Sequence, residues 1–225
     1  MAQPPAEPAL HLDWDRAVAD LAGRGWTLLE DAVRSRQIDL LGAPDDSRWR
    51  LLEDEGVARQ HGFGAYLAFE TAPPAVRQVG SAIILGLSKA AQRLGLPDPS
   101  DFNEATWTRY PQQDGRITKH RDFPEYGGVI AVFTLRGSAI FRVFESDAEV
   151  VEWPTIPGHV VVLRGAGWPS GAHRCPPHAV DAPPEGERVI MTLRSNSNGP
   201  GSGHNSDVGQ TSHTPSHEQS RRAAH

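Results

Sequence analysis

The spacing of apolar residues changes at about residue 100. Upstream of it, apolar residues recur at intervals of three and four over residues 14–21 and 76–94, which predicts two amphipathic helices. Asp13 is suited to cap the first helix, and Gly95 to end the second. A shorter helix is predicted over residues 33–41, and short strands are predicted over residues 25–30, 49–52 and 65–69.

From Phe102 onward, the chain consists of short β-rich runs separated by turn residues. Consecutive strands with no helix between them favour an antiparallel sandwich or barrel. The predicted fold is therefore mainly β, with the N-terminal helices packed on the outside. The predicted strands cover residues 105–110, 117–120, 129–135, 139–144, 150–153, 159–163 and 188–194.

The length of 225 residues, 38% of them hydrophobic, suits one domain with a sizeable core. We expect a loose N-terminus over residues 1–12 and a single domain over residues 13–195. Within that domain, residues 13–100 form a helical, substrate-side part and residues 101–195 form the β core. Residues 196–225 are almost without apolar side chains, which predicts a disordered tail.

Composition removes several classes of function. The formal net charge of −6 disfavours nucleic acid as a partner, because phosphate backbones are usually met by clustered Lys and Arg. The single cysteine, Cys175, rules out an intrachain disulfide and a thiolate zinc cluster. No apolar run is long enough to span a bilayer, and the first residues lack the features of a signal peptide. We expect a cytoplasmic protein with no membrane partner.

His120, Asp122 and His178 are the candidate metal ligands. Alternate residues of a strand point the same way, so His120 and Asp122 would share one face of the predicted strand. Two imidazoles and one carboxylate are the ligands of non-heme ferrous oxygenases. The His-x-Asp spacing is weak by itself, because residues 11–13 show it too. The segment of residues 174–194, which contains His178, strengthens the prediction of a metal site.

Two arginines follow His178 on an alternating strand. Arg188, Ile190, Thr192 and Arg194 would lie on one face, and Val189, Met191 and Leu193 on the other. A buried arginine is costly unless it meets an anion. Either arginine, or both, could grip a short diacid bidentately. The alternative places one or both at the rim, paired with Asp or Glu.

With these residues the sequence resembles the ferrous iron and 2-oxoglutarate dependent dioxygenases, which have a double-stranded β-helix (jelly-roll) core. Their pattern is His-x-Asp, a distal His, and an Arg or Lys about ten residues later, as in His120, Asp122, His178 and Arg188. The stretch FNEATWTRY and the final RVIMTLR are most similar to the AlkB-type (alkylation-repair) branch. In the motifs of that branch Tyr110, Arg188, Thr192 and Arg194 match, whereas Thr108 and Ile190 stand in place of Asn.

The resemblance implies an enzyme with Fe(II), 2-oxoglutarate and O2 as cofactors. His120, Asp122 and His178 would bind the iron. Arg188 would pair with the distal carboxylate of 2-oxoglutarate, with Tyr110, Thr192 and Arg194 as further contacts. The reaction would be hydroxylation of a C–H bond with release of succinate and CO2, and the intact Asp122 argues against halogenation.

The substrate is less constrained. The acidic balance favours a small-molecule or amino-acid-like substrate, and the branch resemblance offers oxidative demethylation of nucleic acid or protein as the alternative. A non-catalytic cupin-like barrel is a further alternative, although a His-x-His pair followed by Glu is missing. Four residues are candidates for substrate contact: Phe123, Tyr126, Arg136 and Trp168.

Overall fold

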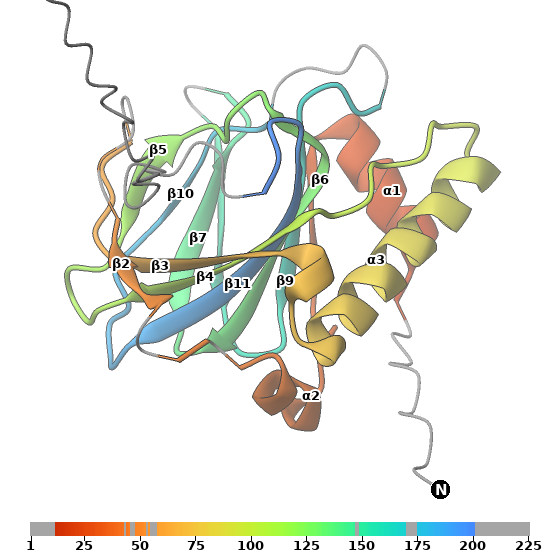
Figure 1. The fold of residues 1–225 in the computed structure, drawn as a ribbon. Helices are drawn as coiled ribbons and strands as arrows, with labels where there is room; N and C mark the ends of the chain where they lie inside the picture. The colour runs from red at the N-terminus through yellow and green to blue at the C-terminus, as the bar shows by residue number, and fades with distance from the viewer. Residues whose placement is uncertain are drawn as a thin grey trace, which may run out of the picture.

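Two antiparallel sheets face each other in the computed structural model (Figure 1). It describes residues 12–200, except 43, 46, 47, 53, 55–57, 147, 148 and 170–174. Across these residues, the larger sheet has the strand order β1-β9-β6-β11-β4-β3-β2 and the smaller sheet β5-β10-β7-β8. This two-sheet arrangement confirms the predicted mainly β fold with a jelly-roll core.

The strands of the larger sheet come from both parts of the chain. The N-terminal part supplies β1 (Trp26–Leu29), β2 (Arg50–Leu51) and β3 (Phe63–Ala68), so it contributes strands as well as helices. The C-terminal part supplies β4 (Glu104–Tyr110), β6 (Tyr126–Arg136), β9 (Val160–Arg164) and β11 (Arg188–Asn196).

The smaller sheet consists of β5 (Ile117–His120), β7 (Ala139–Phe144), β8 (Val150–Thr155) and β10 (His178–Val180). Strand β10 is absent from the sequence prediction. It has only three residues and follows two prolines, so it shows too few alternating positions to be recognised as a strand. Its position depends on pairing with β5 and β7.

The helices are α1 (Trp14–Gly23), α2 (Ser35–Leu40) and α3 (Pro74–Arg93), with a 3-10 turn η2 (Phe69–Thr71). As predicted, the Asp13 side chain caps α1, accepting a hydrogen bond of 3.0 Å from the Arg16 backbone N–H. α1 and α3 lie side by side (Figure 1), and Gly86 lets them approach because a Cβ there would lie 2.3 Å from the Trp14 ring. No helix in the described residues is both long and apolar enough to cross a membrane.

Two hydrophobic cores hold the layers together. The first joins α1 and α3 to the outer face of the larger sheet, through side chains such as Leu21, Leu87 and Trp107. The second lies between the two sheets and includes Phe141, Val161 and Ile190. The larger sheet is thus covered on both faces, and the polar residues of its inner face must find partners inside the β core.

The ends of the predicted domain fall largely outside the described residues. Of the predicted loose segment 1–12, only Leu12 is described, and of the predicted tail 196–225, only residues 196–200. Asn196 does not belong to a tail: it is the last residue of β11 and is 1% exposed. Its side-chain amide donates to Glu104 Oε2 at 3.3 Å, which gives this polar residue a buried partner.

Candidate functional site

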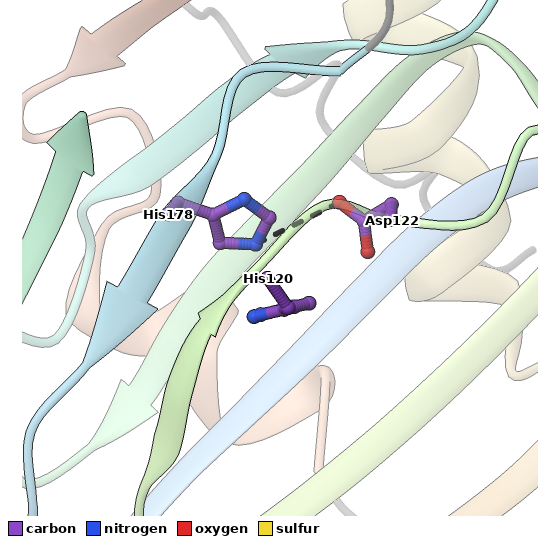
Figure 2. Close-up of side chains that lie close together, drawn as sticks. All are labelled: His120, Asp122 and His178. Carbon is purple, nitrogen blue, oxygen red and sulfur yellow. Dashed lines mark ion pairs between the residues drawn. The ribbon is translucent and has the colours of Figure 1, made fainter. Parts of the chain in front are cut away.

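His120, Asp122 and His178 meet at one end of the smaller sheet (Figure 2). β5 and β10 pair antiparallel with His178 opposite His120, and the two imidazole ring centres are 4.3 Å apart. One ligand atom from each of the three side chains lies within 4.8 Å of the others. The three residues singled out from the sequence therefore form one cluster.

Asp122 reaches this cluster in a different way from the one predicted. β5 ends at His120, so Asp122 lies in the segment after the strand and does not share a strand face with His120. Its carboxylate Oδ2 lies 3.7 Å from His178 Nε2. The segment turns inward, and this geometry brings the carboxylate beside the imidazoles.

Backbone carbonyls fix the orientation of both imidazoles. Nδ1 of His120 lies 2.8 Å from the Thr118 carbonyl oxygen, and Nδ1 of His178 lies 3.0 Å from the Pro176 carbonyl oxygen. A carbonyl only accepts, so each Nδ1 carries a proton and each Nε2 is the ring nitrogen left to face a metal. Second partners of this kind are usual for metal-binding histidines.

The charges of the cluster suit metal binding at neutral pH. Burial lowers the pKa of His178 to about 4, against an opposing effect of Asp122, so this imidazole is neutral. Burial alone would raise the pKa of Asp122, but His178, His120 and Arg194 outweigh it, and the carboxyl pKa is lowered. The site therefore offers a neutral imidazole beside a carboxylate that stays ionised.

Cys175 adds a contact to the carboxylate. Its thiol lies 3.3 Å from Asp122 Oδ2 as a hydrogen-bond donor, and the residue is 2% exposed. Burial raises the pKa of this thiol well above its usual value, so it remains protonated.

Arg188 is buried without a counter-ion. It is 1% exposed, and its Nη2 donates to Thr155 Oγ1 at 3.1 Å and to Thr134 Oγ1 at 3.5 Å. Its Nε and Nη1 have no hydrogen-bond partner, and none of the described carboxylates forms an ion pair with it. Burial lowers its pKa to about 10, so the guanidinium is charged at neutral pH. This is the arrangement expected of a side chain whose anion is supplied from outside.

Arg194 lies six residues further along β11 and is also buried, 7% exposed. The sequence alternative was a pairing with an acid at the rim. Arg194 does pair with an acid, because its Nε donates to Glu104 Oε1, but the pair is buried rather than at the rim, with Glu104 0% exposed. Its guanidinium also stacks over the Tyr126 ring at 4.0 Å. Arg194 thus already has an anion, unlike Arg188.

A cavity of about 310 Å³ joins the cluster to both arginines. As predicted, Arg188, Ile190, Thr192 and Arg194 all face it, and Val189, Met191 and Leu193 pack in the outer core. Tyr110 lines it too, opposite Arg188 in the β4–β11 register. Burial raises the pKa of Tyr110, so its hydroxyl remains a donor.

The four substrate candidates divide into two pairs. Phe123 and Tyr126 line the cavity. Arg136 does not: it is an exposed side chain at the end of β6, 3.5 Å from Glu187. Trp168 does not line the cavity either, because it packs into the outer core and donates from Nε1 to the Pro97 carbonyl at 2.7 Å.

Comparison with known proteins gives a result at the level of structure only. No protein-family model and no curated protein sequence matches the chain. A prolyl-4-hydroxylase from Pseudomonas putida is similar in structure with a TM-score of 0.59 and 20% identity, over 81% of this chain and 98% of that one. An oxidoreductase of the 2OG-Fe(II) oxygenase family from Burkholderia pseudomallei is similar with a TM-score of 0.55 and 17% identity, over 84% of this chain and 93% of that one. The structure of OsALKBH1 is similar with a TM-score of 0.50 and 17% identity, over 76% of this chain and 97% of that one.

The chain has the fold of the 2OG-Fe(II) oxygenases. This confirms the jelly-roll fold expected from the sequence resemblance. At sequence identities of 17–20%, the structural similarity establishes the fold and not the substrate or the reaction.

The residues of this chain fit the two groups that the fold implies. Two Nε2 lone pairs and one carboxylate are donors suited to ferrous iron and leave further coordination positions open. The unpartnered Nε and Nη1 of Arg188 fit one carboxylate of 2-oxoglutarate, and the adjacent Tyr110 hydroxyl can donate to it. We therefore find donors for the metal and for the co-substrate in the same cavity.

Arg121 also lines the cavity, and the sequence prediction missed it. In a continuous strand it would point away from His120 and Asp122. Because β5 ends at His120, that alternation does not extend to residue 121. An arginine between two candidate ligands was the only signal in the sequence that could have found it.

Proposed function

We propose that this protein is an Fe(II)- and 2-oxoglutarate-dependent dioxygenase that hydroxylates a C–H bond of a small-molecule or amino-acid-like substrate. The observation that carries the proposal is the unpartnered, buried guanidinium of Arg188 in the same cavity as His120, Asp122 and His178. A metal-binding barrel without this reaction would need the three ligands but would gain nothing from a buried arginine with no anion.

Each residue has a part that follows from its contacts. The Thr118 and Pro176 carbonyls hold the Nδ1 protons, so His120 and His178 present Nε2 to the metal. The Cys175 thiol holds one oxygen of Asp122, which orients that carboxylate. These contacts set the ligands in place before a metal binds.

At the other end of the cavity, Thr134 and Thr155 hold Nη2 of Arg188, leaving Nε and Nη1 to bind the distal carboxylate of 2-oxoglutarate. Tyr110 would donate to the same co-substrate, and Thr192 and Arg194 line the cavity that would hold it. When bound, the iron and 2-oxoglutarate supply oxygen activation, with 2-oxoglutarate oxidised to succinate and CO2. The buried walls exclude water from this chemistry.

A small substrate is supported by the shape and charge of the chain. The cavity is about 310 Å³, at the lower end of the range usual for small-molecule sites, and most of its lining is buried. The chain is acidic overall, which does not favour a nucleic-acid backbone. Demethylation of nucleic acid or protein is the second candidate, on the resemblance of the motifs around Tyr110 and Arg188 to the AlkB-type branch.

The proposal is tested by anaerobic titration of the metal-free protein with Fe(II) and 2-oxoglutarate. The iron chelate of a 2-oxo acid gives a weak visible charge-transfer band, which we expect in the wild-type protein. His178→Ala should lose it, whereas His61→Ala, at an exposed histidine outside the cavity, should keep it. A wild-type protein that binds iron and 2-oxoglutarate without this band would contradict the assignment.

The substrate class is tested separately by oxygen-dependent succinate formation. We expect stimulation by members of a panel of amino acids and organic acids. Stimulation only by methylated oligonucleotides or peptides would leave the class of enzyme intact and replace the small-molecule substrate by the second candidate.

A further inference from the structure

Arg121 lines the cavity and is exposed to solvent. Of the described residues that line the cavity, Arg121 alone is exposed, and the others are buried or half-buried. It is also adjacent in sequence to both His120 and Asp122. Its charge is therefore accessible both from solvent and from the cavity that holds the metal ligands.

The Arg121 side chain is held toward the site. Its Nη1 donates to the Cys175 carbonyl oxygen, in the segment that leads into His178. This contact occupies one of the five N–H donors of a guanidinium. No described carboxylate forms an ion pair with Arg121, so its charge is balanced by nothing on the protein that the structure describes.

With iron and 2-oxoglutarate bound, the formal charges in the cavity would cancel except for the positive charge of Arg121. The two positive charges of ferrous iron match the two negative charges of 2-oxoglutarate. Asp122 and Glu104 together carry two negative charges, and Arg188 and Arg194 carry two positive charges, so these four residues add no net charge to the site. One positive charge then remains, on the exposed Arg121, and it favours a substrate with one negative charge.

The half-buried residues of the cavity lining indicate the polarity of the rest of the substrate. Leu52, Ile117 and Phe123 are apolar, and Gln60 and Tyr66 offer polar atoms among them. A substrate body with an apolar portion would bury that surface against them. Polar contacts beside it would fix its orientation.

We propose that Arg121 recognises the carboxylate of an organic-acid substrate whose apolar body lies in the cavity beside the metal ligands. This proposal rests on the proposed dioxygenase function and names the substrate class for the same site. Arg121 is a specificity-determining residue in this account, because it contacts the substrate and neither the metal nor 2-oxoglutarate.

The test uses Mn(II) in place of iron, with saturating 2-oxoglutarate and without oxygen, so that no turnover occurs and the Arg188 end is filled. Three acids are added, each beside its uncharged amide: phenylacetate, hexanoate and N-acetylglycine. Broadening of their proton resonances by Mn(II) reports binding close to the metal. The proteins are the wild type, Arg121→Gln, Arg121→Lys and the control Arg77→Gln, an exposed arginine on α3.

We expect at least one acid to bind the wild-type protein at least about tenfold more tightly than its amide, as for a charge-assisted hydrogen bond. Arg121→Gln should remove that preference, Arg121→Lys should keep part of it, and Arg77→Gln should keep all of it. The proposal is overturned if no acid is preferred over its amide, or if the preference persists in Arg121→Gln.

Two further results separate this proposal from its neighbours. If Arg121→Gln weakens binding of a short single-stranded DNA and leaves the acids unaffected, the carboxylate is replaced by phosphate as the recognised anion. If the wild-type protein binds neither Mn(II) nor 2-oxoglutarate before any acid is added, the proposed dioxygenase function fails, and this inference fails with it. Binding of both without acid preference overturns the substrate class alone.

Discussion

Arg188 and Arg194 are the same residue type, six positions apart on the same face of β11, and both are buried. Arg194 forms an ion pair with Glu104, which is fully buried across the β4–β11 pair. Arg188 has only two threonine hydroxyls, and its Nε and Nη1 have no partner. Arg194 therefore has its counter-ion within the fold, whereas Arg188 needs an added anion to balance its charge.

The difference separates a structural charge from a functional one. Removing one member of a buried ion pair leaves the other charge uncompensated in the interior. Removing a buried charge that has no counter-ion removes a desolvation penalty. The same substitution should consequently have opposite effects on stability at the two positions, and ligand binding should depend on Arg188.

The largest effect is expected for Arg194→Met. Glu104 would then be left buried without its cation, which should lower the free energy of unfolding by about 3–5 kcal/mol in urea denaturation of the metal-free protein. The double variant Glu104→Leu/Arg194→Met should recover most of this loss. A single variant as stable as the wild type would show that the ion pair does not stabilise the fold.

The next effect is a pH dependence from His178, which lines the same cavity as the two arginines. The folded protein keeps this imidazole neutral down to about pH 4, and the unfolded chain protonates it near pH 6.5. The unfolded state therefore binds more protons between these values, so stability should fall as the pH is lowered from 7 to 4, by roughly 3 kcal/mol. His178→Gln should flatten this part of the urea-denaturation profile, and an unchanged profile would argue against a neutral, buried imidazole.

Arg188→Met should have the opposite sign to Arg194→Met. Without metal or co-substrate, the variant loses a buried charge that has no counter-ion, so its free energy of unfolding should stay level or rise by about 1 kcal/mol. The check is urea denaturation of metal-free protein beside the wild type. A loss as large as that of Arg194→Met would mean that Arg188 is structural after all.

The smallest effect is expected for Thr155→Val. Its hydroxyl accepts from Arg188 and donates to the Ala139 carbonyl at 3.1 Å, so its loss should cost about 1 kcal/mol and weaken 2-oxoglutarate binding several-fold. Thr27→Val is the control, because Thr27 is also buried but lies outside the cavity. Calorimetry should show weaker 2-oxoglutarate binding for Thr155→Val and unchanged binding for Thr27→Val. Equal affinities of the two variants would show that Thr155 does not orient Arg188 for 2-oxoglutarate.

The sequence predicted those features that depend on local patterns. The alternation over residues 188–194 predicted which side chains of β11 face inward, and the seven strands predicted downstream of residue 102 indicated the fold class. The three metal ligands followed from their residue types and spacing, and the structure brings them together.

The features that were missed depend on where the chain turns and on which distant residue it meets. The end of β5 at His120, which places both Asp122 and Arg121 at the cavity, is not encoded in a periodic pattern. Glu104, the partner of Arg194, is ninety residues away in sequence, so only the strand register reveals the pair. For the same reason, sequence alone could not say which arginine lacked an acid.

The central claim, that Arg188 is left unpaired for the distal carboxylate of 2-oxoglutarate, is tested most directly by comparing two ligands on two proteins. Calorimetry with Mn(II)-loaded protein would measure binding of 2-oxoglutarate and of 2-oxopentanoate, which lacks the distal carboxylate, to the wild type and to Arg188→Met. The account predicts that the wild type prefers 2-oxoglutarate by about 100-fold and that the variant has lost this preference, since a buried charge pair is worth several kcal/mol. An equal preference in both proteins would contradict it.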